Sequence, residues 1–211
     1  MEARYALSMK PTANRGAVVI GDRYRFTVLT DSLIRLEYQE EGRFVDAATQ
    51  TVICRDFPEV EYRVIDKDNS LEIVTDKLHL YYSKKPFSRE GLTIELKEGF
   101  HVYGSAWRYG DPIEDLKGTA RTLDGIDGAV ELEPGLLSRA GFTVLDDSNS
   151  ALIGDDLWPV AKDGQSIDLY FFGYGHDYLR CLKDFYHLSG ATPLLPMHKK
   201  GTGFSWASRT T

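Results

Sequence analysis

The sequence is poor in the residues that build metal sites and disulfide frameworks. Its 211 residues include only two cysteines, Cys54 and Cys181, which lie far apart, and its five histidines are scattered along the chain. Zinc sites and disulfide-rich folds need such residues at short, repeated spacings. We therefore expect no metal ion and no cofactor, and we expect both cysteines to be free thiols in a reducing compartment.

Positive charge and long hydrophobic runs are also scarce. The chain has 25 Lys and Arg against 32 Asp and Glu, which gives a formal net charge of −7 at pH 7, and the basic residues form no cluster. Nucleic acids and anionic membranes attract basic surfaces, so we expect neither as a partner. Residues 1–16 contain no continuous apolar run, so we expect no signal peptide, no membrane span and a cytoplasmic location.

Helical periodicity is nearly absent before residue 176, where short alternating runs take its place. Tyr24, Phe26 and Val28 alternate with polar residues, and Asp31 and Ser32 suit the tight turn that follows. Further runs recur at intervals of about ten residues. The predicted strands are residues 23–30, 33–38, 50–54, 60–65, 70–75, 77–82 and 92–96, with another run ending near Asp146. This pattern predicts an all-β fold, specifically an antiparallel β-sandwich.

One helix is predicted, over residues 176–188. Its expected apolar stripe is formed by Leu179, Leu182, Phe185 and Tyr186, with Arg180, Lys183 and Asp184 facing away. Gly190 and Pro193 are suitable residues for ending it.

An aromatic stretch with several glycines, residues 98–115, separates these strands from an acidic loop. Trp107 in this stretch has two interpretations. It is either a platform on which a sugar ring stacks, because an aromatic face complements the C–H face of a pyranose, or a core aromatic beneath a long loop.

Several segments in a fixed order carry a family resemblance. They are RFTVLTDSLIRLEY (25–38), DFP (56–58), YGDP (109–112), LKGTARTLDGIDG (116–128), GLLSRAGFTVLDDS (135–148), DLYFFGYGHDY (168–178) and TPLLP (192–196). Together they resemble the N-terminal β-sandwich of glycoside hydrolase family 31, the α-glucosidase and α-xylosidase family, in particular its bacterial α-glucosidase-like branch. The resemblance implies a galactose-mutarotase-like supersandwich followed by a catalytic (β/α)₈ barrel.

The resemblance also implies a division of the chain and of the chemistry. Residues 1–22 would be an N-terminal extension with the first strand, 23–175 the β-sandwich, 176–196 the helix and connector to the barrel, and 197–211 a divergent tail, for which disorder is one interpretation. In this family both catalytic aspartates lie on the barrel. We therefore expect a non-catalytic domain that is inactive alone and meets its α-glucoside only in the full-length enzyme.

The acidic loop is the expected contribution to the sugar site. Asp146 and Asp147 are neighbours on a predicted strand and would point to opposite faces, so they do not form an acid pair, and we expect a structural role for Asp147. Asp124 and Asp127 precede glycines, which is also ordinary loop chemistry. In the resembled family a loop at this position lines the sugar subsites. The resemblance therefore makes Asp124, Asp127 and Arg121 candidate substrate-binding residues.

An alternative is a stand-alone carbohydrate-binding or protein-interaction module. Apolar helix surface that a barrel would cover would then be exposed, and we expect such a surface to favour self-association. A calcium loop at Asp124–Asp127 and a nucleotide site at Gly173–Gly175 lack the remaining features of those motifs.

Overall fold

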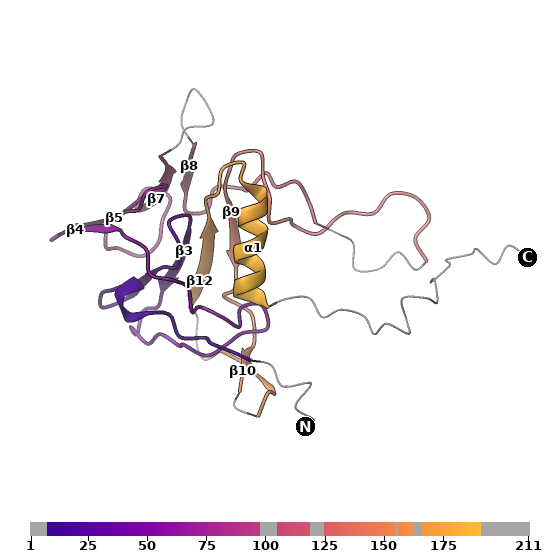
Figure 1. Cartoon of the computed structure of the whole chain (residues 1–211), viewed down its shortest axis with the longest axis horizontal. Coiled ribbons are helices and arrows are strands. Elements are labelled where there is room, and N and C mark those ends of the chain that lie inside the picture. Colours follow the sequence, from indigo (N-terminus) through magenta and orange to yellow (C-terminus); the bar gives the residue numbers. More distant parts are fainter. Residues whose placement is uncertain (1–7, 98–104, 119–124, 155, 163–165, 191–211) are drawn as a thin grey trace, which may run out of the picture.

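The protein consists of two antiparallel sheets packed together, with one helix against the outer face of the first sheet (Figure 1). The computed structural model describes residues 8–97, 105–118, 125–154, 156–162 and 166–190. The predicted all-β sandwich with a helix near its C-terminal end is confirmed. Within the described residues, no helix has the length and hydrophobicity needed to cross a membrane.

The first sheet has the strand order β1-β2-β3-β12-β9. Its strands are β1 (Val18–Ile20), β2 (Tyr24–Val28), β3 (Leu33–Tyr38), β9 (Thr143–Asp146) and β12 (Ile167–Phe172). β12 lies between β3 and β9, so a strand near the start of the described chain pairs with one near its end in the middle of the sheet.

The second sheet has its strands in sequence order, β4-β5-β6-β7-β8, as expected for consecutive hairpins. Its strands are β4 (Arg63–Lys67), β5 (Ser70–Val74), β6 (Leu78–Tyr82), β7 (Leu92–Leu96) and β8 (Ser105–Arg108). A short hairpin of β10 (Leu152–Ile153) and β11 (Pro159–Val160) and a 3-10 turn at Arg15–Ala17 complete the described elements.

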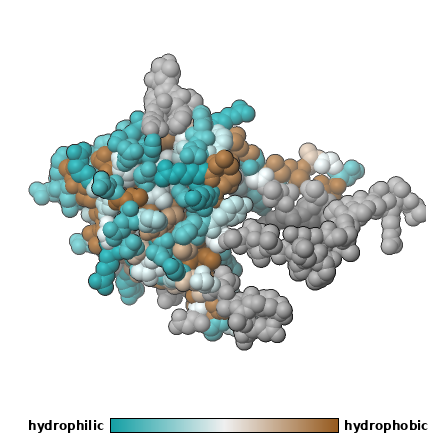
Figure 2. Space-filling view, in the orientation of Figure 1, coloured by the Kyte–Doolittle hydropathy of each residue, from teal (hydrophilic) through white to brown (hydrophobic). Residues whose placement is uncertain are grey.

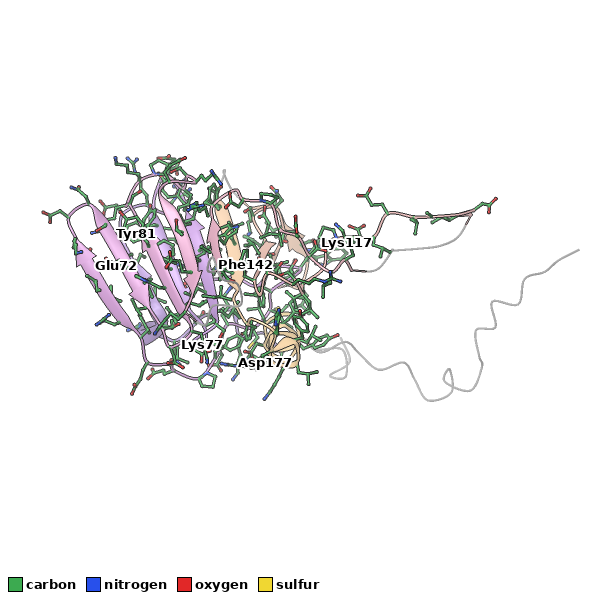
Figure 3. All side chains as sticks on the ribbon, turned by 90° about the horizontal axis from the view of Figure 1, so that it is seen from above. Glu72, Lys77, Tyr81, Lys117, Phe142 and Asp177 are labelled. Atoms are coloured by element: carbon green, nitrogen blue, oxygen red, sulfur yellow. The ribbon has the colours of Figure 1, made fainter. Side chains whose placement is uncertain are left out.

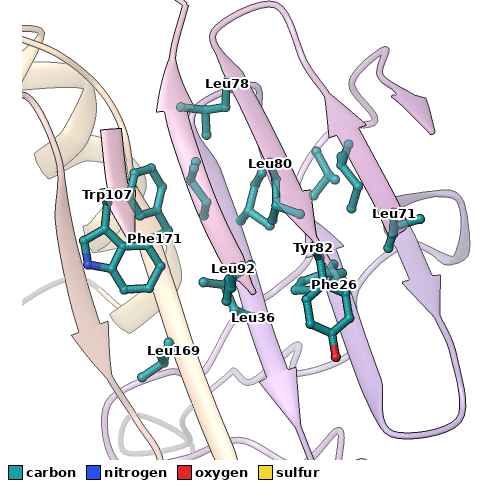
Figure 4. Close-up of a cluster of buried hydrophobic side chains, with 14 of the residues drawn as sticks. Phe26, Leu36, Leu71, Leu78, Leu80, Tyr82, Leu92, Trp107, Leu169 and Phe171 are labelled. Atoms are coloured by element: carbon teal, nitrogen blue, oxygen red, sulfur yellow. The ribbon is translucent and has the colours of Figure 1, made fainter. Parts of the chain in front are cut away.

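The core lies between the two sheets, where alternate residues of β5, β6, β7 and β8 meet residues of β2, β3 and β12 (Figure 4). In β6, Leu78, Leu80 and Tyr82 are fully buried, and they pack on Phe26 and Leu36 of the first sheet. Each such side chain contributes about 1.5–3 kcal/mol through burial.

A second cluster fills the space between the first sheet and the helix α1 (Tyr178–Ser189). In β12, Leu169 and Phe171 face the sandwich core, whereas Tyr170 and Phe172 face this second cluster. Because both faces of β12 are buried, residues 169–172 form a continuous apolar run, and the one charged residue of the strand, Asp168, is paired with Arg35.

The predicted helix is present, but its buried face differs in part from the prediction. α1 begins after Asp177, whose side chain accepts a hydrogen bond from the Arg180 N–H (3.1 Å). Cys181 and Leu188 are buried, while Leu179 is 82% exposed and Tyr186 48% exposed. The helix therefore carries two apolar stripes, and the sequence alone did not show which one meets the sheet.

Asp184, which was predicted to face away from the protein, is turned inward instead. Its carboxylate accepts a hydrogen bond from the Tyr174 hydroxyl (2.6 Å). This partner compensates the partial burial of the charge.

Most predicted strands are confirmed, and two predictions are corrected. β3 and β7 have the predicted bounds, but β4 begins at Arg63 rather than at residue 60. Residues 50–54 were predicted as a strand and form none. They follow a loop held by the Thr49 hydroxyl, which accepts a hydrogen bond from the Val52 N–H (2.9 Å). β8 was not predicted, because its four residues are too few to show a period.

Charged residues occupy the outer face of the first sheet where segment 43–49 covers it. Arg35 donates two hydrogen bonds to Asp168, each of 2.8 Å, and Arg25 donates two to Glu37, of 2.6 and 2.9 Å. All four side chains are buried. These residues belong to the segments that carry the family resemblance, and here they join β2, β3 and β12 to one another.

Candidate functional site

The acidic loop leaves the sandwich as a long arm, residues 116–138, of which 119–124 lie outside the described residues (Figures 1 and 3). At its root the two sides of the arm pair through their backbones. The Leu116 N–H donates to the Leu137 carbonyl and the Gly118 N–H to the Glu133 carbonyl, both at 2.7 Å. Figure 3 shows Lys117 where the arm departs.

Two glycines allow this close pairing. A Cβ atom on Gly135 would lie 2.6 Å from the backbone of Lys117, and one on Gly118 would lie 2.9 Å from the Pro134 carbonyl oxygen. Real Cβ atoms do not approach so closely, so a side chain at either position would push the two sides of the arm apart. Lys117 itself has a positive φ of 67°. The arm is therefore built on a tightly specified root.

The described tip of the arm, residues 125–134, combines acidic and apolar residues. It contains Asp127, Glu131 and Glu133 and no Lys or Arg, and Ile126, Val130 and Leu132 are exposed. Figure 2 shows hydrophobic residues along this projection. Apolar side chains together with carboxylates, held away from the sandwich, form a surface suited to contact another molecule or another part of a longer chain.

The predicted substrate-binding residues are distributed unevenly over this geometry. Arg121 and Asp124 lie outside the described residues. Asp127 is exposed on the arm between Gly125 and Gly128, which have positive φ values of 71° and 102°. The glycine conformations are those expected of ordinary Asp-Gly loop chemistry.

Trp107 is not on the arm. Its side chain is 3% exposed and belongs to the core between the sheets (Figure 4). Its ring packs against Phe171 and Tyr109, with centroids 5.6 and 6.3 Å away. Sugar stacking at Trp107 is therefore corrected to the alternative interpretation, a core aromatic, because no ring face is open to a ligand.

Asp146 and Asp147 stabilise the fold, as expected for Asp147. Asp147 is fully buried and accepts hydrogen bonds from the Thr49 hydroxyl at 2.9 and 3.1 Å. Asp146 accepts from the Ser148 N–H at 2.9 Å and so holds the turn after β9. Neither carboxylate shares a concave site with the other.

Sequence reasoning missed a cavity between the sandwich and the start of α1, of about 420 Å³ including space open to solvent. Lys77, Asp177 and Arg180 line it, and Figure 3 shows Lys77 and Asp177 near each other. Gly173 forms part of its wall, and a Cβ there would lie 2.6 Å from the Leu78 side chain. Gly173 and Gly175 were the only sequence feature that pointed to this cavity. The absence of a side chain at Gly173 allows close packing against Leu78.

The cysteines and acidic residues offer no described metal centre. In the described ranges, no three His, Cys, Asp or Glu side chains gather as metal ligands. Cys54 and Cys181 are both free thiols, and burial, followed by the charges of Asp184 and Asp177, raises the pKa of Cys181 to about 12.

No protein-family model matches the sequence, and neither does any curated protein. Among solved structures, the chain is similar to a Flavobacterium johnsoniae GH31 dextranase complexed with glucose and to a mutant of that dextranase complexed with isomaltotriose. Each comparison has a TM-score of 0.46 and 13% sequence identity, and covers 85% of this chain and 27% of the dextranase chain. This chain thus spans about a quarter of the length of the dextranase it resembles.

Proposed function

We propose that the chain is a non-catalytic β-sandwich domain of an α-glycosidase of the family 31 type, and that its arm lines the sugar subsites of the longer enzyme. The observation that carries this proposal is the arm itself. The two sides of the arm pair closely at its root, where Gly118 and Gly135 have no side chain to keep them apart. This root holds acidic and apolar residues away from the sandwich. Such a projection has no evident use in stabilising the sandwich from which it departs.

The arm has the chemistry that a sugar subsite needs. A carboxylate such as Asp127 accepts charge-assisted hydrogen bonds from sugar hydroxyls, and apolar side chains such as Ile126 suit the C–H face of the ring. Arg121 and Asp124 belong to the same proposed subsite on the strength of the sequence resemblance. Catalysis is assigned to the rest of the longer enzyme, an α-glucosidase-like hydrolase acting on an α-glucoside.

The second apolar stripe of α1 supports a docking role. Leu179 and Tyr186 are exposed, and they are seven residues apart on one side of the helix. In this proposal the stripe packs on the catalytic barrel, and in a chain without a barrel it would favour self-association. Two free thiols fit the cytoplasmic location that is part of the proposal.

Two measurements test the proposal. Pure protein should release no chromophore from an aryl α-glucoside, and measurable turnover by the sandwich would overturn it. In an NMR titration with isomaltose or maltose, we expect weak shifts on the arm that shrink in Asp127→Asn. The matched control is Glu95→Gln, at an exposed carboxylate of β7 in the second sheet. Shifts that avoid the arm, or that respond equally to both variants, would contradict the subsite.

The alternative function is a stand-alone carbohydrate-binding or protein-interaction module, and the exposed stripe of α1 is the observation that favours it. Light scattering distinguishes the two when it is combined with Leu179→Glu. A stable dimer that this variant dissociates, together with no sugar-dependent shifts, would favour the interaction module.

A further inference from the structure

A second polar site lies on the outer face of the first sheet, away from the arm. Segment 43–49 and β10 cover part of this face and leave a cavity of about 470 Å³, including space open to solvent. Its polar lining consists mainly of Arg35, Glu37, Gln39, Lys162, Ser166 and Asp168. Phe44 and Val45 add an apolar wall.

The guanidinium of Arg35 is only partly satisfied. Its Nε and Nη2 atoms donate to Asp168, but its Nη1 atom makes no hydrogen bond to any residue that the structure describes. The nearest acid to Nη1 is Asp46, whose Oδ1 atom is 3.9 Å away, beyond hydrogen-bond distance. The Arg35 side chain is 3% exposed, yet Nη1 is not one of the fully buried polar atoms without a partner in the described part of the chain, so this nitrogen keeps contact with the open space of the cavity.

Other donors around the cavity are also unused. The Gln39 side-chain oxygen accepts from the Arg43 N–H (3.1 Å), while its amide NH₂ has no described partner. The Ser166 hydroxyl has no partner among the described residues either. Lys162 Nζ donates to the Asp147 carbonyl (2.6 Å) and to Asp168 (3.2 Å), which leaves one N–H.

The acceptors of the cavity, in contrast, are already engaged. Both oxygens of Asp168 accept from Arg35, and both oxygens of Glu37 accept from Arg25. The cavity therefore has donors in excess, and a ligand that satisfies them must bring acceptor oxygens.

We propose that this cavity binds a small organic carboxylate, with the Arg35 Nη1 atom as the central donor and Ser166, Gln39 and Lys162 around it. Guanidinium and carboxylate are complementary in shape and charge. A monoanion fits better than a phosphate dianion, because Glu37 and Asp168 lie in the same floor and repel additional negative charge. Phe44 and Val45 suit the short hydrocarbon part of such a ligand. The site is independent of the sugar-binding function proposed for the arm.

The test is an NMR titration of the whole protein with propionate, with sodium chloride holding the ionic strength constant. We expect saturable shifts of Ser166 and neighbouring amides with a dissociation constant of about 1 mM or lower. Propionamide, the neutral isostere, and inorganic phosphate should bind much more weakly. The absence of saturation, or equal binding of propionamide or phosphate, would overturn the proposal.

Variants then locate the site. Arg35 is not substituted, because its loss would also break the ion pair with Asp168. Ser166→Ala removes one donor and should weaken propionate binding about three- to ten-fold. Ser88→Ala, an exposed serine in the loop before β7, is the matched control and should bind propionate as the unmodified protein does. An unchanged dissociation constant in Ser166→Ala would contradict the placement of the carboxylate in this cavity.

Discussion

Arg35 on β3 and Asp168 on β12, separated by 133 positions in the sequence, form a two-pronged ion pair with both hydrogen bonds at 2.8 Å. Both side chains are buried. Since the two strands are neighbours in the first sheet, this pair joins distant parts of the chain at one specific register.

Removing one partner of this pair should destabilise the protein strongly. Asp168→Asn removes the carboxylate that accepts both hydrogen bonds from the buried Arg35 and leaves only Glu37, 3.1 Å away, as its buried acid, and we expect a loss of about 3–5 kcal/mol in the free energy of unfolding. Arg23→Ala, at the exposed ion pair with Glu40, should cost about 1 kcal/mol or less. Urea denaturation measures both values, and equal losses in the two variants would contradict the structural role of Arg35 and Asp168.

The same pair predicts how stability depends on acid. Burial raises the pKa of Asp168, but the charge and hydrogen bonds of Arg35 outweigh it, so the net pKa lies well below its usual range. The stabilisation is therefore complete above the unfolded pKa of about 3.9, and is lost as pH falls from there toward the lower folded pKa. The free energy of unfolding measured across this range should decrease as the pH is lowered.

Asp168→Asn should show a shallower decline below pH of about 4, because it lacks this titration. Glu37 has the opposite sign: burial, outweighing Arg35 and Arg25, raises its pKa, so its protonation partly offsets the loss. A variant with the same acid dependence as the unmodified protein would show that Asp168 is not the group responsible.

The arm root should be intolerant of even one methyl group at Gly135. Gly135→Ala places a Cβ against the Lys117 backbone, and we expect a cost of about 1–3 kcal/mol, together with faster proteolytic cleavage of the arm. Gly16→Ala is the control, because its nearest neighbour would be the Glu59 side chain at 3.5 Å, an ordinary contact. Arm cleavage at the same rate in both variants would argue against a specified root.

The two thiols should differ in reactivity. Burial raises the pKa of Cys181 to about 12, so almost none of this thiol is the reactive thiolate at pH 8, and it is also shielded from reagents. Cys54 is only half-buried. Iodoacetamide followed by mass spectrometry should therefore label Cys54 first and Cys181 only after unfolding. Early labelling of Cys181 would mean that α1 detaches readily from the sheet.

The sequence predicted best those strands whose bounds are set by residue alternation or by a turn next to them. β7 alternates between buried and outward residues, and its bounds were predicted correctly. β3 was predicted as accurately, although it is buried on both faces, because the turn at Asp31 and Ser32 fixed its start. The buried stripe of α1 was misjudged, since Leu179 and Cys181 are equally acceptable to a periodic pattern.

The candidate sites also differ in whether local sequence or the packing of distant segments creates them. Composition alone singled out the arm, because glycines and acids cluster there within one segment. The carboxylate cavity could not be predicted, because Arg35, Lys162 and Ser166 come together only when β12 pairs with β3. The burial of Trp107 likewise depends on the packing of one sheet on the other.

The position of β12 also sets the order in which the protein can assemble. Strands β4 to β8 pair with their sequence neighbours and need only short loop closures, so they can form early. β9, whose pairing partner in the described sheets is β12, must wait for β12 to insert beside β3. We therefore expect that, during refolding, the amides of the second sheet become protected from hydrogen exchange first and that insertion of β12 is the slow step. A nascent chain that stops before residue 167 lacks β12, so β9 cannot yet join the first sheet.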